Sequence, residues 1–295
     1  MRIYPNLLGN SLMLVETSLQ LKPFGWSGRP VSAIGMGTYY DFSWIIKARL
    51  GRRAGAASKV EALKAGLDKG ITLIDTAEIY NSEPLVAKAI AGRSREDLFI
   101  ATKVMFLHLR HDALIRALER SLRSLELNFV DLYQIHQPSL FVPIEETMGA
   151  MEEMVDRGLT RFIGISNFSV KQTVAASKAM KKYRIASIQM PYNLEDRRVE
   201  REILPLCKRE NIAFLAYFPL GHGKLVTNPK LQEIGARHGK TAPQVALNWL
   251  LMQENVFPIP RASNAAHVKE NLGSMDWRLS GEEMNELDRL FPPPH

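Results

Sequence analysis

The sequence predicts an α/β fold in which eight parallel strands close into a (β/α)8 TIM barrel. Short apolar runs alternate with amphipathic stretches, at a recurrence of roughly 25 to 40 residues. No GxGxxG motif, which would favour a doubly wound sheet, follows an early strand. The eight expected strands are Ser32–Thr38, Ile71–Asp75, Leu98–Lys103, Phe129–His136, Arg161–Ser166, Ala186–Met190, Ile212–Tyr217 and Val256–Ile259.

The stretches between these strands have the pattern of helices that cover a sheet. In Arg110–Leu125, leucines recur at helical spacing on one face, and charged residues occupy the other face. Three further helix starts are marked by the spacing of a capping box, which is independent of apolar periodicity. The pairs are Ser169 with Gln172, Thr241 with Gln244, and Ser280 with Glu283.

Segments near the two ends of the chain predict elements in addition to the eight strand–helix units. Lys22–Val31 has glycines between apolar residues, which predicts a β-hairpin that could close the barrel floor. A helix over about Ser280–Leu290 is additional to the eight units, and the prolines after it prevent its continuation. We expect residues 1–18 to be an N-terminal extension of uncertain order and residues 19–295 to form a single barrel domain.

Composition excludes several classes of protein. The 295 residues are 46% hydrophobic and 23% charged, enough for a large core. The single cysteine, Cys207, forms no internal disulfide and belongs to no zinc-spaced cluster, so we expect no metal site and a reducing compartment. No apolar stretch approaches the roughly 20 residues of a membrane span, which predicts a cytoplasmic protein without membrane contact.

The charge distribution speaks against nucleic acid as a partner. The formal net charge is +7, but the basic residues are mostly spread along helices beside acidic ones. An unusually basic run, Lys47–Arg53, is best interpreted as a solvated loop, although it would also attract an acidic or phosphorylated substrate. Oligomeric state cannot be read from the sequence, and a monomer is the default expectation.

Four polar residues of complementary chemistry stand at the ends of neighbouring strands. Asp75, Lys103 and His136 end the second, third and fourth expected strands, and Tyr80 lies in the loop after Asp75. Because the carboxyl ends of barrel strands converge on one face, these four residues should become neighbours. Each alone has a structural interpretation, such as a turn cap or a buried histidine, but together they predict a catalytic group.

The chemistry of this group suits carbonyl reduction. A hydride that reaches a carbonyl carbon leaves negative charge on the oxygen, which then needs a proton donor. Tyr80 can donate that proton, and a cationic Lys103 beside it would favour the ionised phenol. Asp75 can hold Lys103 charged and oriented, while His136 can hydrogen-bond the substrate oxygen.

The segments IDTAEIY, ATK and LYQIHQP resemble, in order and spacing, the Asp-Tyr-Lys-His tetrad of aldo-keto reductases. GISNF, IQMPYN, LAYFPLG and IPRASNAAHVKENL are similar to the cofactor-binding segments of the same family, so the resemblance covers about Lys22–Leu290. It implies nicotinamide-dependent reduction of an aldehyde or ketone to an alcohol. The implied cofactor-binding residues are Gly37, Thr38, Asp75, Ser166, Asn167, Gln189, Tyr217, Pro219, Leu220, Gly221, Arg261, Ser263, Glu270 and Asn271.

The last of these segments favours NADPH over NADH. A helix N-terminus offers free N–H groups, and Arg261 offers a planar cationic group suited to a 2′-phosphate. His267 stands where many NADPH-selective members have arginine, so NADH use stays possible.

The substrate is expected to be a small carbonyl compound, but the sequence does not name it. Relative to the family, the NSEPL segment after Tyr80 is short, and Gln137 and Met105 stand at or near frequent aromatic positions. These departures predict a differently shaped pocket. The expected substrate-binding residues are Tyr39, Trp44, Tyr80, Met105, His136 and Gln137, with Tyr40 as a further aromatic of the same loop.

Two other functions stay open at this point. Potassium-channel β subunits share the scaffold and the tetrad, so the chain could be a regulatory subunit that binds cofactor with little turnover. A lyase could instead use Lys103 to form a Schiff base. Metal-dependent hydrolysis is disfavoured, because His108 and His111 lie in a helical segment without further ligands nearby.

Overall fold

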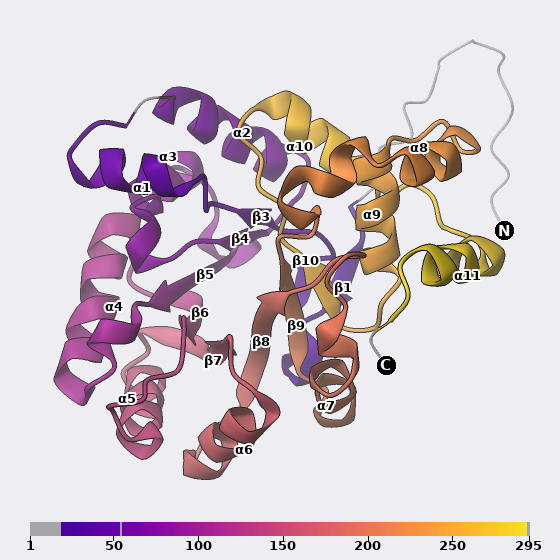
Figure 1. The fold of residues 1–295 in the computed structure, drawn as a ribbon. Coiled ribbons are helices and arrows are strands. Elements are labelled where there is room, and N and C mark those ends of the chain that lie inside the picture. The colour runs from indigo at the N-terminus through magenta and orange to yellow at the C-terminus, as the bar shows by residue number, and fades with distance from the viewer. Residues whose placement is uncertain (1–18, 54, 294–295) are drawn as a thin grey trace, which may run out of the picture.

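The computed structural model describes residues 19–53 and 55–293, in which eight parallel strands curl into a barrel (Figure 1). Each strand pairs with the next one along the chain, as in other parallel barrels. The predicted (β/α)8 fold is therefore confirmed. The barrel strands are β3 (Met36–Gly37), β4 (Leu73–Asp75), β5 (Phe99–Val104), β6 (Val130–Ile135), β7 (Thr160–Ser166), β8 (Ile185–Pro191), β9 (Ala213–Tyr217) and β10 (Val256–Pro258).

The barrel closes where β3 meets β10. Gly35 N–H donates to Pro258 O at 2.9 Å, and Gly37 N–H donates to Pro260 O at 3.1 Å. A Cβ at Gly37 would lie 2.7 Å from the Ile259 carbonyl oxygen, so only glycine permits this approach. The strand predicted over Ser32–Thr38 is thus shorter than expected, because Ser32 belongs to the hairpin instead.

The predicted hairpin is present and closes the barrel floor. Its strands β1 (Leu21–Pro23) and β2 (Pro30–Ser32) pair antiparallel on either side of the short helix η1 (Gly25–Ser27). Phe24, which is fully buried, points its ring at Phe99 and Phe257, with centroid distances of 4.6 and 5.3 Å. The hairpin therefore contributes apolar side chains to the lower end of the barrel.

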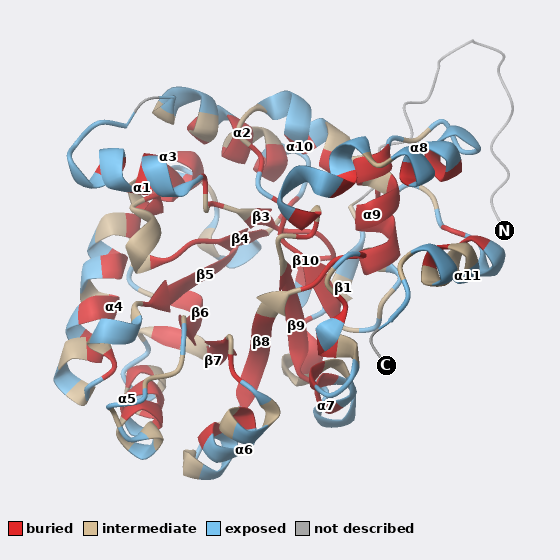
Figure 2. Ribbon diagram, viewed as in Figure 1, coloured by how far each residue is buried: buried red, intermediate tan, exposed pale blue. Residues whose placement is uncertain are grey.

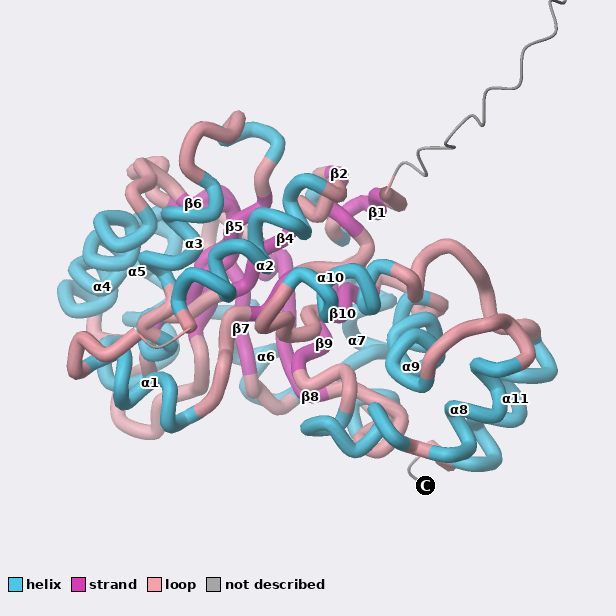
Figure 3. Tube along the Cα trace, turned by 90° about the horizontal axis from the view of Figure 1, so that it is seen from above, coloured by secondary structure: helices cyan, strands magenta, loops and turns pink. Residues whose placement is uncertain are grey.

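Helices surround the strands, as the view from above shows (Figure 3). Buried residues fill the strands and the helix sides that face them, while the outer helix sides are exposed (Figure 2). The three predicted capping boxes are all formed. The helices are α1 (Phe42–Arg49), α2 (Ala56–Asp68), α3 (Glu83–Ile90), α4 (His111–Leu125), α5 (Ile144–Asp156), α6 (Val170–Ala179), α7 (Ile203–Glu210), α8 (Pro229–Ala236), α9 (Ala242–Leu251), α10 (Ala265–Leu272) and α11 (Gly281–Leu290).

Helix α1 was not expected, since its residues were interpreted as a loop after the first strand. The Asp41 side chain caps it by accepting a hydrogen bond from Trp44 N–H at 2.7 Å. The additional C-terminal helix α11 is confirmed, whereas the predicted extension over residues 1–18 lies outside the described residues. None of the helices described is both long and apolar enough to cross a membrane.

The barrel interior changes from apolar at the floor to polar at the mouth. Strand side chains alternate between the interior and the helix layer. On β4 and β5, Leu73 and Phe99 belong to the floor cluster that contains Phe24, and Asp75 and Lys103 follow them on the same alternation. The carboxyl ends of these strands therefore bring polar side chains together above an apolar plug.

We predict that Phe24→Ala lowers the free energy of unfolding by about 3–5 kcal/mol, because it leaves a cavity among closely packed rings. Urea denaturation would measure this as a lower midpoint at an unchanged slope. The matched control is Leu21→Ala on the same hairpin, where the side chain is exposed and the expected change is within about 0.5 kcal/mol. Equal losses in the two variants would contradict a floor held by Phe24.

Candidate active site

The four predicted catalytic residues meet at the mouth of the barrel. Asp75 ends β4, Lys103 lies near the end of β5, His136 follows β6, and Tyr80 ends the short helix η2 (Glu78–Tyr80). Tyr80 Oη lies 3.3 Å from His136 Nε2, and Lys103 Nζ donates to Asp75 Oδ2 at 2.6 Å. Residues up to 61 positions apart in sequence thus form one contiguous polar group (136 − 75 = 61).

The Lys103–Asp75 pair is shielded from water. The Lys103 side chain is 0% exposed and that of Asp75 is 4% exposed. Lys103 Nζ also donates to Thr76 O at 2.8 Å, and Asp75 Oδ1 accepts from Gln189 Nε2 at 2.8 Å. Burial lowers the pKa of Lys103, and the attraction of Asp75 opposes that change. The pair is a buried ion pair whose remaining hydrogen bonds come from the residue after β4 and from β8 on another part of the barrel wall.

Tyr80 lies between aromatic rings and a cation. Its ring makes edge contacts with Tyr39 and His136, and Lys103 Nζ lies 4.9 Å from its centroid. Burial, followed by the negative charge of Asp75, raises the pKa of the Tyr80 phenol well above its ordinary value. The expected effect of Lys103, which is to favour the ionised phenol, stays a prediction, and burial and Asp75 both act in the opposite direction.

His136 is held neutral by its surroundings. Burial lowers its pKa to about 3, and the charge of Lys103 acts in the same direction. Its carbonyl oxygen accepts from Asn167 Nδ2 at 3.0 Å, which links the ends of β6 and β7. A neutral imidazole beside a protonated phenol gives the mouth two groups that can hydrogen-bond one oxygen atom.

The predicted residues on β7, β8 and β9 form a second polar group next to the first. Ser166 Oγ donates to Gln189 O at 2.9 Å, and Tyr217 Oη donates to Asn167 Oδ1 at 2.8 Å. Asn167 has a left-handed backbone (φ 63°), which asparagine tolerates better than most residues. Gln189 connects the two groups, because its side chain donates to Asp75.

The loop after β9 turns sharply over the next predicted residues. Tyr217 is followed by Phe218, whose φ of 50° is uncommon for a bulky residue, and then by Pro219, Leu220 and Gly221. Phe218 O accepts hydrogen bonds from Gly221 N–H and from Asn193 Nδ2, both at 3.0 Å. The loop continues into η6 (Gly221–Thr227), and it is this turn that brings Phe218 to Tyr39.

The predicted phosphate segment begins before α10 with Arg261 and Ser263 and ends in the last turn of that helix with Glu270 and Asn271. Arg261 is exposed and pairs with Gly37 across the barrel closure. Ser263 O accepts from Ser58 Oγ at 3.0 Å, while Glu270 Oε1 accepts from Thr241 Oγ1 at 3.1 Å. The remaining predicted residues of this region are largely buried and hydrogen-bonded within the fold, namely Thr38 with Asp75 O and Asn271 through its carbonyl with Ser274.

The predicted substrate residues are spread unevenly around the mouth. Tyr39 packs against Tyr80 and Phe218, with centroid distances of 5.3 and 5.9 Å. Met105 is half-buried directly after β5, and Gln137 is exposed directly after His136. Trp44, by contrast, is only 5% exposed and packs against Tyr40, so its ring would have to leave this cluster to touch a substrate.

These observations agree with a comparison of the whole chain. Residues 33–291 match the model of the aldo/keto reductase family. The chain belongs to this family. The resemblance drawn from the tetrad motifs is therefore confirmed, and the chain is an oxidoreductase of the aldo-keto reductase type with a barrel fold.

Similar proteins of the family include enzymes that act on small dicarbonyl compounds. Methylglyoxal reductase YeaE of Escherichia coli (strain K12) is 33% identical over 286 residues, which cover 94% of this chain and 97% of the relative. Glyoxal reductase of Bacillus subtilis (strain 168) is 34% identical over 232 residues, covering 78% and 82%.

A solved aldo/keto reductase from Klebsiella pneumoniae, in complex with NADP and acetate, matches with a TM-score of 0.86 at 34% identity. The match covers 94% of this chain and 97% of that chain. An aldo-keto reductase from the same organism in complex with NADPH matches with the same TM-score and identity, covering 94% and 96%.

Sequence reasoning missed two side chains that contact the tetrad or its loop, and one beside the predicted aromatic residues Tyr40 and Trp44. Gln134 Nε2 contacts Asp75 Oδ1 at 3.3 Å, and it lies two residues before His136 on the same inward face, a signal that the strand alternation contains. Glu78 binds Met105 N–H and Arg120, which fixes the loop that carries Tyr80. Lys59 Nζ lies 4.9 Å from the Tyr40 ring centroid, and no local motif indicates it.

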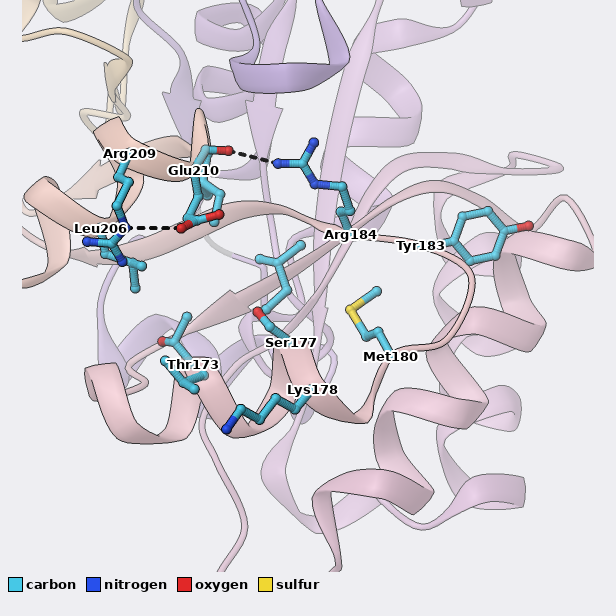
Figure 4. A pocket seen from close by; sticks show the side chains of 12 residues that line it. Thr173, Ser177, Lys178, Met180, Tyr183, Arg184, Leu206, Arg209 and Glu210 are labelled. Atoms are coloured by element: carbon cyan, nitrogen blue, oxygen red, sulfur yellow. Dashed lines mark hydrogen bonds and ion pairs between the residues drawn. The ribbon is translucent and has the colours of Figure 1, made fainter.

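A hollow of about 320 Å³ lies outside the barrel, between α6 and α7 (Figure 4). Its rim includes Arg184, which donates to Glu210 O at 3.0 Å, and its floor includes Ile185 and Ile212 at the amino ends of their strands. It therefore opens away from the carboxyl ends that carry the tetrad.

Within the described residues, no three His, Cys, Asp or Glu side chains gather in a way that could hold a metal ion.

We predict that His136 shows no protonation between pH 5 and pH 9, because its pKa is depressed to about 3. His111 is the internal reference, since hydrogen bonds to Asp112 and Glu153 raise its pKa. Nitrogen-15 NMR of the histidine rings, assigned with His136→Gln and His111→Gln, would follow both residues. A midpoint for His136 near its ordinary 6.5 would show that the imidazole is solvated in the free protein.

Proposed function

We propose that the chain reduces an aldehyde or ketone to an alcohol with NADPH, with Tyr80 as the proton donor. The observation that carries this proposal is the 3.3 Å contact between Tyr80 Oη and His136 Nε2 above a buried Lys103–Asp75 pair. A carbonyl oxygen hydrogen-bonded to both groups would lie where a proton donor and a neutral imidazole converge. When bound, NADPH supplies a hydride from C4 of its nicotinamide ring to the carbonyl carbon.

Tyr80 transfers its phenolic proton to the oxygen on which negative charge develops. Its raised pKa keeps the proton in place across the neutral range, so the donor is loaded before reaction. The phenolate that forms lies beside the Lys103 ammonium, which stabilises it once the negative charge exists. Lys103 therefore acts on the product of proton transfer, and Asp75 keeps Lys103 oriented.

His136 positions the substrate oxygen. Because it is neutral, one ring nitrogen carries a proton and can donate a hydrogen bond. It adds no positive charge that would favour loss of the proton from Tyr80 before the substrate arrives. His136 therefore orients the substrate oxygen, and Tyr80 donates the proton.

The donor set on β7 to β9 fits a nicotinamide carboxamide. Ser166, Asn167 and Gln189 offer both hydrogen-bond donors and acceptors at neighbouring strand ends, and Tyr217 offers an aromatic ring beside them. Arg261 and the start of α10 would hold the ribose 2′-phosphate, since the guanidinium is exposed and the first N–H groups of a helix bind anions. The loop Pro219–Gly221 would approach the pyrophosphate through its backbone.

Two further proposals extend the predictions made above. The substrate is a small carbonyl compound, as for the methylglyoxal and glyoxal reductases that the chain resembles. NADPH is preferred because Arg261 would bind its 2′-phosphate, and NADH is also used because His267 stands where many NADPH-selective members have a permanent cation. The single domain over residues 19–295, the cytoplasmic location and the monomeric state stay predictions.

The decisive experiment follows NADPH oxidation against a panel of aldehydes and ketones, with NADH in parallel and direct titration of both cofactors. Turnover with at least one carbonyl compound supports the reductase function. Tight NADPH binding without turnover on any member of the panel would contradict it and would favour the regulatory subunit instead.

We predict that Tyr80→Phe lowers kcat by roughly 10² or more, because the variant lacks the donated proton, while NADPH binding is unchanged. Stopped-flow turnover and fluorescence titration of NADPH would measure the two quantities separately. The matched control is Tyr39→Phe, which removes a neighbouring hydroxyl and should change kcat less than about 10-fold. A similar loss in both variants would remove Tyr80 from its special role.

We predict that Arg261→Ala weakens NADPH binding roughly 10- to 100-fold, as expected for lost hydrogen bonds to a charged group of about 1.5–3 kcal/mol. NADH, which lacks the 2′-phosphate, should bind within about three-fold of its original affinity. Lys269→Ala, an exposed cation at the other end of α10, serves as the control for non-specific charge loss. Equal weakening of both cofactors by Arg261→Ala would contradict a 2′-phosphate contact.

A further inference from the structure

Glu78 stands at the start of the short helix that carries the proposed proton donor. Helix η2 contains only Glu78, Ile79 and Tyr80, and Tyr80 N–H donates to Ala77 O at 3.0 Å. Asn81, directly after the helix, has a left-handed backbone (φ 55°). A single 3₁₀ turn has poor hydrogen-bond geometry, so this segment needs contacts with other elements to hold Tyr80 in place.

The Glu78 carboxylate provides such contacts, because it accepts hydrogen bonds from the segment that follows β5. Oε2 accepts from Met105 N–H at 3.1 Å, and Oε1 accepts from the Arg120 guanidinium of α4 at 3.0 Å. His108, which ends the short helix η4 (Phe106–His108), places Nδ1 2.9 Å from Oε1 and 3.1 Å from Oε2. The carboxylate thus joins η2 to three separate points of the chain from the end of β5 into α4.

The surroundings of Glu78 favour its ionised form. The side chain is 17% exposed, so water competes little for its oxygen atoms. Burial raises the pKa of Glu78, but the hydrogen bonds from Met105 N–H, Arg120 and His108 together outweigh burial, and the pKa is lowered. Hydrogen bonds to an ionised acceptor are stronger than those to a neutral one, so the carboxylate is a firm anchor for η2.

Glu78 and Tyr80 point to different sides of the same turn. Successive side chains of a 3₁₀ helix are about 120° apart, so residues two positions apart do not share a face. Glu78 reaches the segment after β5, while Tyr80 Oη lies 3.3 Å from Nε2 of His136, directly after β6. A rotation of this turn would therefore change the distance between the Tyr80 hydroxyl and the imidazole.

We propose that Glu78 is a positioning residue for proton donation, whose carboxylate holds η2 in the rotation that brings the Tyr80 hydroxyl to His136. The inference rests on the proposed function, because that function gives the hydroxyl its role in the reaction. The hydrogen bond from Met105 N–H also joins the proton donor to a predicted substrate residue. Glu78 acts through Tyr80, so its replacement should lower kcat and leave the affinity for NADPH unchanged.

The test compares Glu78→Gln with the native chain. The amide keeps the size of the side chain, but it loses the charge and turns one acceptor atom into a donor. We expect kcat to fall about 10-fold, since a misplacement of about 1 Å can cost up to 10² in rate, while KM and the Kd of NADPH stay within about three-fold. The matched control is Arg116→Gln, an exposed arginine one turn before Arg120 on α4, which should change none of these quantities.

A double-mutant cycle with Tyr80→Phe separates positioning from a general structural role. If Glu78 acts through the Tyr80 hydroxyl, Glu78→Gln should lower kcat less than about two-fold in the Tyr80→Phe background. If Glu78→Gln does not fold, Arg120→Gln serves in its place. This variant removes one donor to the carboxylate, so kcat should fall about three-fold, again only when the Tyr80 hydroxyl is present.

Nitrogen-15 NMR of the His136 ring gives a readout that needs no turnover. The Nε2 resonance should move in Glu78→Gln towards its position in Tyr80→Phe, because both variants weaken the contact between the hydroxyl and the imidazole. In Arg116→Gln the resonance should stay in place.

Several outcomes would overturn the proposal, and they differ from failure of the proposed function. One is an unchanged kcat together with an unchanged His136 resonance. Another is a loss of kcat that is equally large in the Tyr80→Phe background, because Glu78 would then act independently of the hydroxyl. A rise in KM alone would assign the carboxylate to substrate binding instead. Absence of turnover in the native chain overturns the proposed function, and the His136 resonance then still decides whether Glu78 positions Tyr80.

Discussion

The buried ion pair between Lys103 and Asp75 imposes the main constraint on this barrel. Two charges that leave water lose several kcal/mol of hydration each, and their mutual attraction offsets this only when the remaining hydrogen bonds are made. Thr76 O, Gln134 and Gln189 make them, and these partners belong to β4, β6 and β8 or the residues directly after them. The hydrogen bonds that stabilise the two charges therefore require β4, β6 and β8 to keep their positions relative to β5.

The barrel floor is apolar and needs no charged partner, in contrast to the polar mouth. Phe24, Phe99 and Phe257 form an aromatic plug whose dispersion and apolar burial do not depend on any charge. Gly37 permits the close approach of β3 and β10 that completes the wall around both layers. The floor is the smaller of the two apolar clusters, and most buried apolar side chains belong to the larger cluster that includes the surrounding helices.

The strands and the tetrad could be predicted because both follow from periodicity. Inward positions recur every second residue, so polar residues at strand ends such as Asp75 and Lys103 stand out from the sequence. Gln134 follows the same rule and was missed, because a single glutamine within a strand indicates no particular partner. Helix α1 was missed as well and interpreted as a loop, since its exposed positions Phe42 and Ile46 are apolar and the segment lacks the polar outer face that marks a covering helix.

The chain order of a parallel barrel also separates the two proposed ligands. Consecutive strands are neighbours, so β3 to β6 carry the tetrad, while β7 to β10 lead into all the proposed cofactor residues except Gly37, Thr38 and Asp75. Besides the backbone pairing of β6 with β7, hydrogen bonds from Gln189 to Asp75 and from Asn167 to the His136 carbonyl join the two halves. Loops of the first half can thus change in length and polarity without moving the cofactor residues. We therefore expect the substrate preference of this chain to be decided in those loops, two of which carry Met105 and Gln137.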